Sequence, residues 1–295
     1  MSGHPQGGTL AVVALLASLA GCGPETAQRL HETTPLASAV NRAADFLSTR
    51  RLEHAELWFV HQASRRLGRG FPHWAAALRD NGPPDWAESV LADLRGLDVH
   101  RFPPLPAPMA IPVHPSASLA GSAAETMDLI GTLFFAVRQC SREDHDRDQR
   151  LRELLAVETS GYLLAHQAWT LAVGVSRGCL AAEAVEPRRR EMAMEMMSEL
   201  VSSDGLTDLD LERMAILCVL DLCYWVPKEF FDRAIERQLP SGSWGTPAPP
   251  GVDSKDVREE HAAALGFYAL ASLFELSQRS RPWLDLSCAR AGGGP

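Results

Sequence analysis

The stretch QLPSGSWG, residues Gln238 to Gly245, lies between two apolar segments of helical periodicity and predicts a tight reversal between two helices. Gly242 can adopt a positive φ, which other residues resist, so the chain can turn within a few residues. The side chain of Gln238 can hydrogen-bond backbone groups left open at the helix end. Trp244 can then pack against Gln238 and against the neighbouring helices. We therefore expect an antiparallel helix pair joined at this turn.

The rest of the chain has the same helical pattern. Apolar residues recur at a period near 3.6, and no convincing alternation of period two is present. Pro72, Pro187 and Pro227 suit the first position of a helix, and Thr207 followed by Asp208 suits a helix start. The predicted fold class is all-α, built from antiparallel helix pairs. The predicted helices span residues 36–50, 53–68, 72–81, 84–95, 123–139, 147–158, 160–183, 187–202, 208–224, 227–238 and 256–278.

The spacing of Gln238, Gly242 and Trp244 resembles the Q-x-x-x-G-x-W turn that is repeated in terpenoid cyclases, prenyltransferases and related α/α-toroid proteins. This resemblance implies a partial or complete α/α toroid, in which the inner helices run parallel and their equivalent ends face one rim. The resemblance covers residues 227–276, and more weakly residues 36–68 and 147–180.

The catalytic motifs of those families are mostly missing from this chain. Asp208-Leu209-Asp210-Leu211 lacks the fourth residue of the protonating Asp-x-Asp-Asp motif, and no D-D-x-x-D magnesium motif is present. Asp208 and Asp210 are better explained as acids that stabilise a helix start. The resemblance therefore implies a fold, and cyclase or prenyltransferase activity does not follow from it.

The first 22 residues resemble a bacterial lipoprotein signal. The apolar run TLAVVALLASLAG is too short to span a bilayer and ends in the lipobox-like Leu19-Ala20-Gly21-Cys22. This predicts a signal peptide over residues 1–21, acylation of Cys22 and a lipid-anchored protein outside the cytoplasmic membrane. Unlike an ordinary signal peptide, the segment before the apolar run has no Lys or Arg. The alternative is a mis-set start codon or an ordinary first helix, with a cytoplasmic protein.

Beyond the signal, we expect a tether over residues 22–35, a helical domain over 36–280 and a loose tail over 281–295. Residues 103–115 contain six prolines, which exclude a helix and favour an extended segment. This segment is either a crossover strapped across one helical domain or a linker between two domains. The formal net charge of −9 argues against nucleic acid or an anionic membrane surface as the main partner.

The cysteines beyond Cys22 do not have the pattern of a disulfide framework. They are odd in number, and Cys218 and Cys223 stand five residues apart on one predicted helix, so they point in different directions. This is neither a C-x-x-C redox pair nor a usual zinc motif. We expect buried thiols, a prediction that argues against an exported protein. The cysteines concerned are Cys140, Cys179, Cys218, Cys223 and Cys288.

Three predicted helices carry a histidine in their first half: His61, His166 and His261. In a toroid these histidines could converge on one mouth of the central cavity. Three neutral imidazoles with an open fourth position suit zinc, which lowers the pKa of a bound water. The alternative is that each histidine packs between helices and hydrogen-bonds a neighbouring one. The chain has no H-E-x-x-H motif, but Glu56, Glu158 and Glu260 could orient the imidazoles or act as a base.

Two tryptophans accompany these histidines. Trp58 precedes His61 by three residues and Trp169 follows His166 by three, so each tryptophan shares a helix face with its histidine. With His261 they could line a cavity for an apolar or cationic ligand, whereas the alternative is ordinary core packing.

Two functions remain open from the sequence. The first is a membrane-tethered binding or interaction domain without catalysis or cofactor, whose partner is a small apolar ligand or another protein. The second is a metal-dependent hydrolase or lyase with zinc at His61, His166 and His261.

Overall fold

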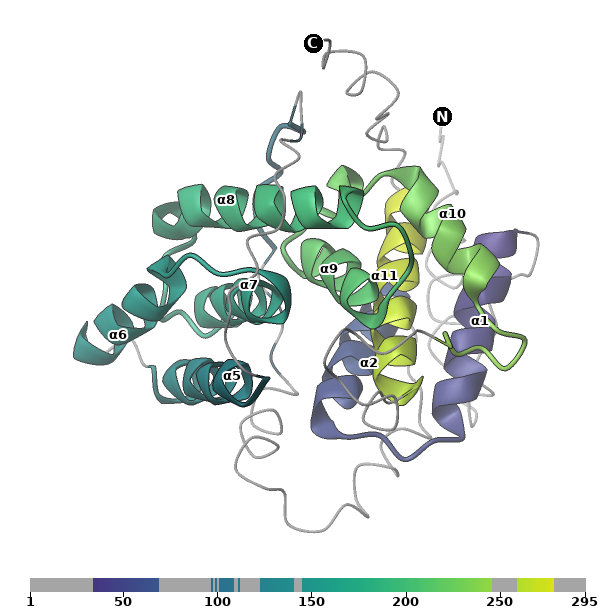
Figure 1. Cartoon of the computed structure of the whole chain (residues 1–295), viewed down its shortest axis with the longest axis horizontal. Coiled ribbons are helices and arrows are strands. Elements are labelled where there is room, and N and C mark those ends of the chain that lie inside the picture. Colours follow the sequence, from purple (N-terminus) through teal and green to yellow (C-terminus); the bar gives the residue numbers. More distant parts are fainter. Residues whose placement is uncertain are drawn as a thin grey trace, which may run out of the picture.

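The computed structural model describes residues 34–68, 97, 99, 101–108, 111, 123–140, 145–245 and 259–278 (Figure 1). This part of the chain is helical and contains no strand, so the predicted all-α class is confirmed. The elements are α1 (Pro35–Ser48), α2 (His54–Arg66), α5 (Ala123–Gln139), α6 (His145–Ala156), α7 (Gly161–Ser176), α8 (Ala182–Val201), α9 (Asp208–Val219), the short 3-10 helix η1 (Cys223–Trp225), α10 (Lys228–Arg237) and α11 (Glu259–Gln278).

Two predicted helices were too long at their C-terminal ends. The helix predicted over 160–183 ends at Ser176, because the chain turns at Gly178 with φ +75°. The helix predicted over 208–224 ends at Val219, because Asp221 has φ +55°. An aspartate is one of the few residues other than glycine that tolerates this conformation.

The role predicted for Pro187 was wrong. Helix α8 begins five residues earlier, at Ala182, so the proline lies inside the helix, where its missing N–H leaves one helical hydrogen bond unmade. Pro227 directly precedes α10 and is its N-cap. The helices predicted over 72–81 and 84–95, with Pro72, lie outside the described residues, as do the segment 1–33 and the tail 281–295.

Helices α2, α9 and α11 run in the same direction. Arg66 at the end of α2 donates to Glu275 near the end of α11 (2.9 Å) and to the carbonyl of Cys218 near the end of α9 (2.9 Å). The first turns of α9 and α11 meet as well, since Asp208 lies 3.2 Å from His261. The three helices therefore present equivalent ends on the same side of the protein.

Helix α7 shares this direction. The Tyr162 hydroxyl donates to Asp208 of α9 (3.0 Å), and one turn further on His166 lies 3.2 Å from Glu212 of α9. The second contact lies four residues further along each helix than the first, so α7 and α9 are parallel. Parallel neighbours of this kind are what the toroid resemblance implies for inner helices, while the closed ring stays a prediction.

The turn after α10 is held by the side chain of Gln238. Its Nε2 donates to the carbonyls of Gly242 (3.1 Å) and of Ala39 in α1 (3.0 Å), and its Oε1 accepts from Arg42 of α1 (3.1 Å). Gly242 has φ +97°, which confirms the conformation predicted for it. Gln238 thus binds the turn itself and the neighbouring helix α1, whereas we predicted bonds to the open end of its own helix.

Trp244 occupies that open end instead. Its Nε1 donates to the carbonyl of Ala234 in the last turn of α10 (2.7 Å), and the side chain is buried. Its ring also lies against Gly266 of α11, where an added Cβ would come within 2.6 Å of a ring carbon. Trp244 therefore joins α10 to α11.

The described part of the proline-rich segment is extended and packs on the helices. We call residues 101–108 the strap. Phe102 and Leu105 are buried, Arg189 of α8 donates to the Pro103 carbonyl (2.8 Å), and the Tyr224 hydroxyl of η1 donates to the Leu105 carbonyl. The strap therefore belongs to the same packed unit as α8 and η1.

The cysteine prediction was wrong for the four cysteines that the structure describes. Cys140 and Cys179 form a disulfide that links α5 to the turn after α7, and Cys218 and Cys223 form a second one. The second pair was missed because one continuous helix was predicted through both residues. The helix ends between them, and the chain folds back so that the two Cα atoms lie 4.1 Å apart.

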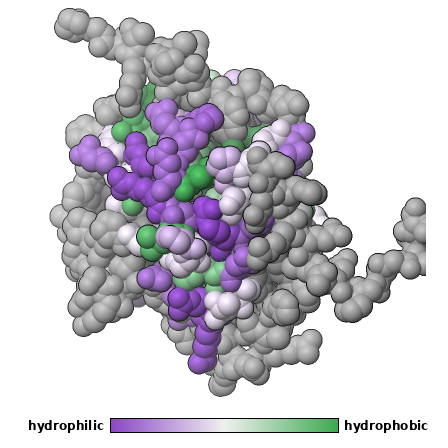
Figure 2. All heavy atoms as spheres, turned by 90° about the vertical axis from the view of Figure 1, so that its right-hand side faces the viewer, coloured by the Kyte–Doolittle hydropathy of each residue, from purple (hydrophilic) through white to green (hydrophobic). Residues whose placement is uncertain are grey.

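The helices at the edge of the fold are amphipathic. In α10, Phe230, Phe231 and Ala234 are buried while Lys228 and Asp232 form an exposed ion pair. Figure 2 views the side on which α1 and α10 lie, and its described surface is mainly hydrophilic with small hydrophobic patches. Of the helices described, none combines the length and the apolar content needed to cross a membrane.

Candidate functional site

Two of the three predicted histidines lie near each other where the N-terminal halves of α7, α9 and α11 come together. We call this side of the protein the histidine end. His166 of α7 and His261 of α11 both contact acidic residues of α9, and His261 is near enough for its charge to lower the pKa of His166. His61 lies on the neighbouring helix α2 and is partly exposed.

His261 is held by a buried aspartate. Its Nδ1 lies 3.2 Å from each carboxylate oxygen of Asp208, which also accepts a hydrogen bond from the Tyr162 hydroxyl. Burial alone would lower the pKa of His261, but the charge of Asp208 and its hydrogen bond outweigh burial and raise the pKa to about 9. His261 is therefore an imidazolium at neutral pH. Burial and the nearby Asp208 raise the pKa of Tyr162, so its hydroxyl keeps its proton.

His166 has the opposite protonation state. Burial lowers its pKa to about 4, although a hydrogen bond to the Tyr162 carbonyl (2.8 Å) favours the charged form. Because a carbonyl can only accept, Nδ1 carries the proton and Nε2 of the neutral ring has a free lone pair. Oε1 of Glu212 also lies 3.2 Å from Nδ1, which fixes the orientation of the ring.

Glu212 is the least satisfied member of this cluster. The residue is buried, and its Oε2 has no hydrogen-bond partner among the described residues. Burial raises the pKa of its carboxyl group to about 8, so that the group is mostly protonated at neutral pH. A buried carboxyl oxygen without a partner destabilises a protein, and unpaired groups of this kind concentrate at functional sites.

A second buried charged network lies at the histidine end, and the guanidinium at its centre is fully paired. Arg213 donates to Glu199 (2.6 and 2.9 Å) and to Asp210 (2.9 Å), and Glu199 accepts from the backbone N–H of Gly161 (2.9 Å). All three guanidinium nitrogens thus have a partner, and the network joins the beginnings of α7 and α9 to α8. Its role is to hold the helices that carry the histidine cluster.

The partly exposed side chains of His166 and His261 define what the site can do. The Nδ1 atoms are engaged inside the protein, and the side chains of His166 and His261 are 22% and 29% exposed. The Nε2 atoms have no hydrogen-bond partner among the described residues. At neutral pH His166 offers an acceptor and His261 offers a charged donor. Such a pair can bind a ligand that has both kinds of group, or move a proton on it.

The predicted tryptophans contact each other beneath this cluster. The rings of Trp58 and Trp169 are 5.5 Å apart in an edge-to-face arrangement, and both side chains are buried. The ring of Trp58 also meets Tyr268 of α11 at 6.5 Å. This is the ordinary core packing that we gave as the alternative to an open, tryptophan-lined cavity.

The predicted zinc site has no geometric support in the described residues, where no group of three or more His, Cys, Asp or Glu side chains is arranged to hold a metal ion. The site at His61, His166 and His261 stays a prediction. Of the accompanying glutamates, Glu56 forms the capping box of α2 and Glu260 lies 3.9 Å from Arg50. Glu56 also adds to the charge that raises the pKa of His261.

The residues that organise this site were not predicted from the sequence. Asp208 was explained as a helix-start acid, and Tyr162 and Glu212 were not selected at all. A signal was present: Tyr162 and His166 are four residues apart, as are Asp208 and Glu212, so each pair shares one helix face. Comparisons of the chain with protein-family models, with curated proteins and with solved structures give no match.

Proposed function

We propose that this protein is a lipid-tethered helical domain that binds a small polar ligand at its histidine end. The observation that supports the proposal is the pair His166 and His261, whose Nδ1 atoms are anchored by buried acceptors while the side chains are partly exposed. Anchoring of this kind orients a ring before a ligand arrives and lowers the entropic cost of binding.

The protonation states indicate the chemistry of the ligand. His261 donates from a positively charged ring, so it suits a carboxylate, phosphate or carbonyl oxygen. The neutral His166 accepts from a hydroxyl or an amine. A small molecule that has a hydroxyl group next to an acidic or carbonyl group satisfies both. We therefore favour a polar ligand over the apolar or cationic ligand that the tryptophans suggested.

The proposal is tested with a set of small hydroxy acids, sugar alcohols and sugar phosphates in ligand-observed NMR. We expect at least one member to bind the full chain at pH 7, and to lose binding in the double variant His166→Gln/His261→Gln. Circular dichroism checks that the variant is folded. A set without a binder, or equal binding to the folded variant, would overturn the proposal.

A second candidate function is acid–base catalysis on the bound ligand. It is favoured by one observation: neighbouring imidazoles are held on opposite sides of neutral pH, with a pKa of about 4 for His166 and about 9 for His261. Environments that push two pKa values apart commonly mark the base and the acid of a catalytic pair. His166 would be the base and His261 the acid, without a metal ion in the proposed steps.

Asp208→Asn should lower the pKa of His261 from about 9 to its ordinary value of 6.5 or below. The charge of Asp208 is the largest influence that raises the pKa of His261 against burial, so its removal leaves burial dominant. An NMR titration of the histidine side chains measures the change. Asp210→Asn is the matched control, because Asp210 is buried in the same helical turn but binds Arg213 and should leave the pKa of His261 unchanged. A His261 pKa that stays near 9 in Asp208→Asn would contradict the assignment.

The proposed lipid anchor is attached to Cys22, which lies outside the described residues. The two disulfides support a location outside the reducing cytoplasm, because such bonds persist mainly in oxidising compartments. We expect Cys22→Ser to move the protein from the membrane to the soluble fraction, since the acyl chains attach to this residue. Cys288→Ser is the control, and unchanged fractionation of Cys22→Ser would refute the lipid anchor.

A further inference from the structure

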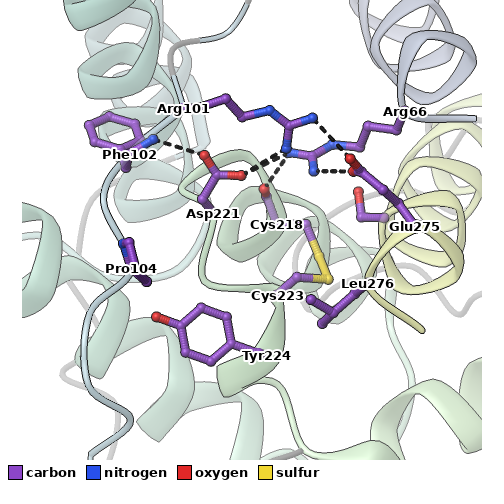
Figure 3. A pocket seen from close by; sticks show the side chains of 11 residues that line it. Arg66, Arg101, Phe102, Pro104, Cys218, Asp221, Cys223, Tyr224, Glu275 and Leu276 are labelled. Atoms are coloured by element: carbon purple, nitrogen blue, oxygen red, sulfur yellow. Dashed lines mark hydrogen bonds and ion pairs between the residues drawn. A yellow bond between two sulfur atoms is a disulfide. The ribbon is translucent and has the colours of Figure 1, made fainter. Parts of the chain in front are cut away.

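A cavity of about 250 Å³ lies at the opposite end of the parallel helices, where the ends of α2, α9 and α11 meet the strap (Figure 3). We call it the arginine cavity. Its position separates it from the histidine end, since His261 and Glu275 are at opposite ends of α11. Its walls include the charged side chains of Arg66, Arg101, Asp221 and Glu275 and the aromatic rings of Phe102 and Tyr224.

Two arginines and two carboxylates form a closed ring of ion pairs in this wall (Figure 3). Arg66 pairs with Glu275 (2.9 Å) and Asp221 (3.5 Å), and Arg101 pairs with Asp221 (3.1 Å) and Glu275 (3.2 Å). The second oxygen of Asp221 accepts from the backbone N–H of Phe102 (2.9 Å). All four carboxylate oxygens thus have a donor already.

Some of the N–H and O–H groups in the wall of the arginine cavity, in contrast, have no acceptor among the described residues. Arg66 uses all three of its nitrogens, including bonds to Tyr268 and to the Cys218 carbonyl. Arg101 is half-exposed, and its two bonds leave three of the five N–H groups of a guanidinium without an acceptor among the described residues. The hydroxyl of the buried Ser272 also has no partner among the described residues. The described wall of the cavity therefore offers unused donors, whereas each carboxylate oxygen already has a donor.

The remaining wall is apolar and fixed in place. Phe102, Pro104 and Leu276 supply apolar surface, and the ring of Tyr224 is held by the bond from its hydroxyl to the strap. The disulfide between Cys218 and Cys223 closes the loop that carries Asp221 (Figure 3). A ligand would find a preformed surface, because both the loop and the strap are anchored in the absence of a ligand.

We propose that the arginine cavity binds a small organic carboxylate with an apolar body. Arg101 donates from its free edge to the carboxylate, and the apolar body lies against Phe102, Tyr224 and Leu276. Arginine suits this role because its planar N–H groups match the two oxygens of a carboxylate. A cationic ligand is disfavoured, because it would compete with Arg66 and Arg101 for Asp221 and Glu275. This site is additional to the ligand proposed for the histidine end.

Benzoate and 3-phenylpropionate are suitable probes, and benzamide is a neutral molecule of the same shape as benzoate. We expect NMR titration of the full chain to give a dissociation constant on the order of 1 mM or below for the carboxylates, a range typical of ligands of this size. Benzamide should bind at least about tenfold more weakly, because it lacks the charge that Arg101 recognises. The largest shifts should occur at the Phe102 amide and at Arg101 Nε–H.

Arg101→Gln should weaken benzoate binding at least about tenfold while the protein stays folded, since the side chain is half-exposed. Arg50→Gln is the matched control: Arg50 is 44% exposed and pairs with Glu260, which follows Glu259, the first residue of α11. It removes the same charge and should leave benzoate binding unchanged. The double variant His166→Gln/His261→Gln should also bind benzoate normally, which separates this inference from the proposed function. Equal binding of benzoate and benzamide, or undiminished binding by Arg101→Gln, would overturn it.

Discussion

Gly242→Ala should lower the free energy of unfolding by about 2–4 kcal/mol. The residue has φ +97°, which a side chain resists, and an added Cβ would lie 2.0 Å from the Arg42 carbonyl oxygen of α1. Relief of this clash must separate the turn from α1 and break the bonds that Gln238 makes to both. Urea unfolding followed by circular dichroism measures the loss.

Gly205→Ala provides the matched control for this change. Gly205 lies in the turn between α8 and α9, its φ is not positive, and an added Cβ would meet no atom within 4 Å. We expect its effect to stay within about 1 kcal/mol of the wild type. Equal stabilities for the two variants would show that the turn does not pack on α1 as described.

Glu212→Gln should raise the free energy of unfolding by about 1–3 kcal/mol at pH 8. The carboxyl group has a pKa of about 8 in the folded protein, against 4.5 as its ordinary value. As the pH rises from 4.5 to 8, the unfolded chain releases this proton while the folded protein retains it, so the wild type loses stability over that interval. A glutamine does not ionise and avoids the loss. The two proteins should therefore have similar stability near pH 4.5 and diverge above it.

Glu199 is another buried glutamate of the histidine end, and Glu199→Gln should change the free energy of unfolding in the opposite direction. Glu199 accepts from Arg213 and from Gly161 N, so its loss leaves a buried guanidinium with a weaker partner. It should lower the free energy of unfolding by about 1–3 kcal/mol at neutral pH. Denaturant unfolding of both variants from pH 4.5 to 8 checks the two signs together. Destabilisation of Glu212→Gln at pH 8 would mean that the carboxyl group has a partner and is a structural element.

Local features of the fold could be predicted from the sequence because local patterns determine them. Among the described residues, the helical period located most helices to within a few residues. It failed where a residue with positive φ ended a helix, and at the start of α8, where Pro187 lies inside the helix. The Q-x-x-x-G-x-W spacing gave the turn and the conformation of Gly242. Its partner could not be predicted, because Gln238 binds Ala39, a residue 199 positions away in the sequence.

The candidate site was predicted only in part for the same reason. The repeated histidines identified His166 and His261, but Asp208 has a local explanation as a helix-start acid that hides its contact with His261. The histidine and the aspartate are 53 residues apart and meet only because α9 and α11 are parallel neighbours. The disulfides and the arginine cavity likewise depend on where α9 ends and where the strap lies, which no local pattern encodes.

The position of α11 also determines when the protein can fold during its synthesis. This helix packs against α1, α2 and α9, and the ion pair of Arg66 with Glu275 joins residues 209 positions apart. The apolar faces of α1 and α2 therefore remain without this partner until the ribosome has added α11. Long-range contacts of this kind slow folding and leave apolar surface exposed while the chain grows. The native core is thus completed only when synthesis of the chain is nearly finished.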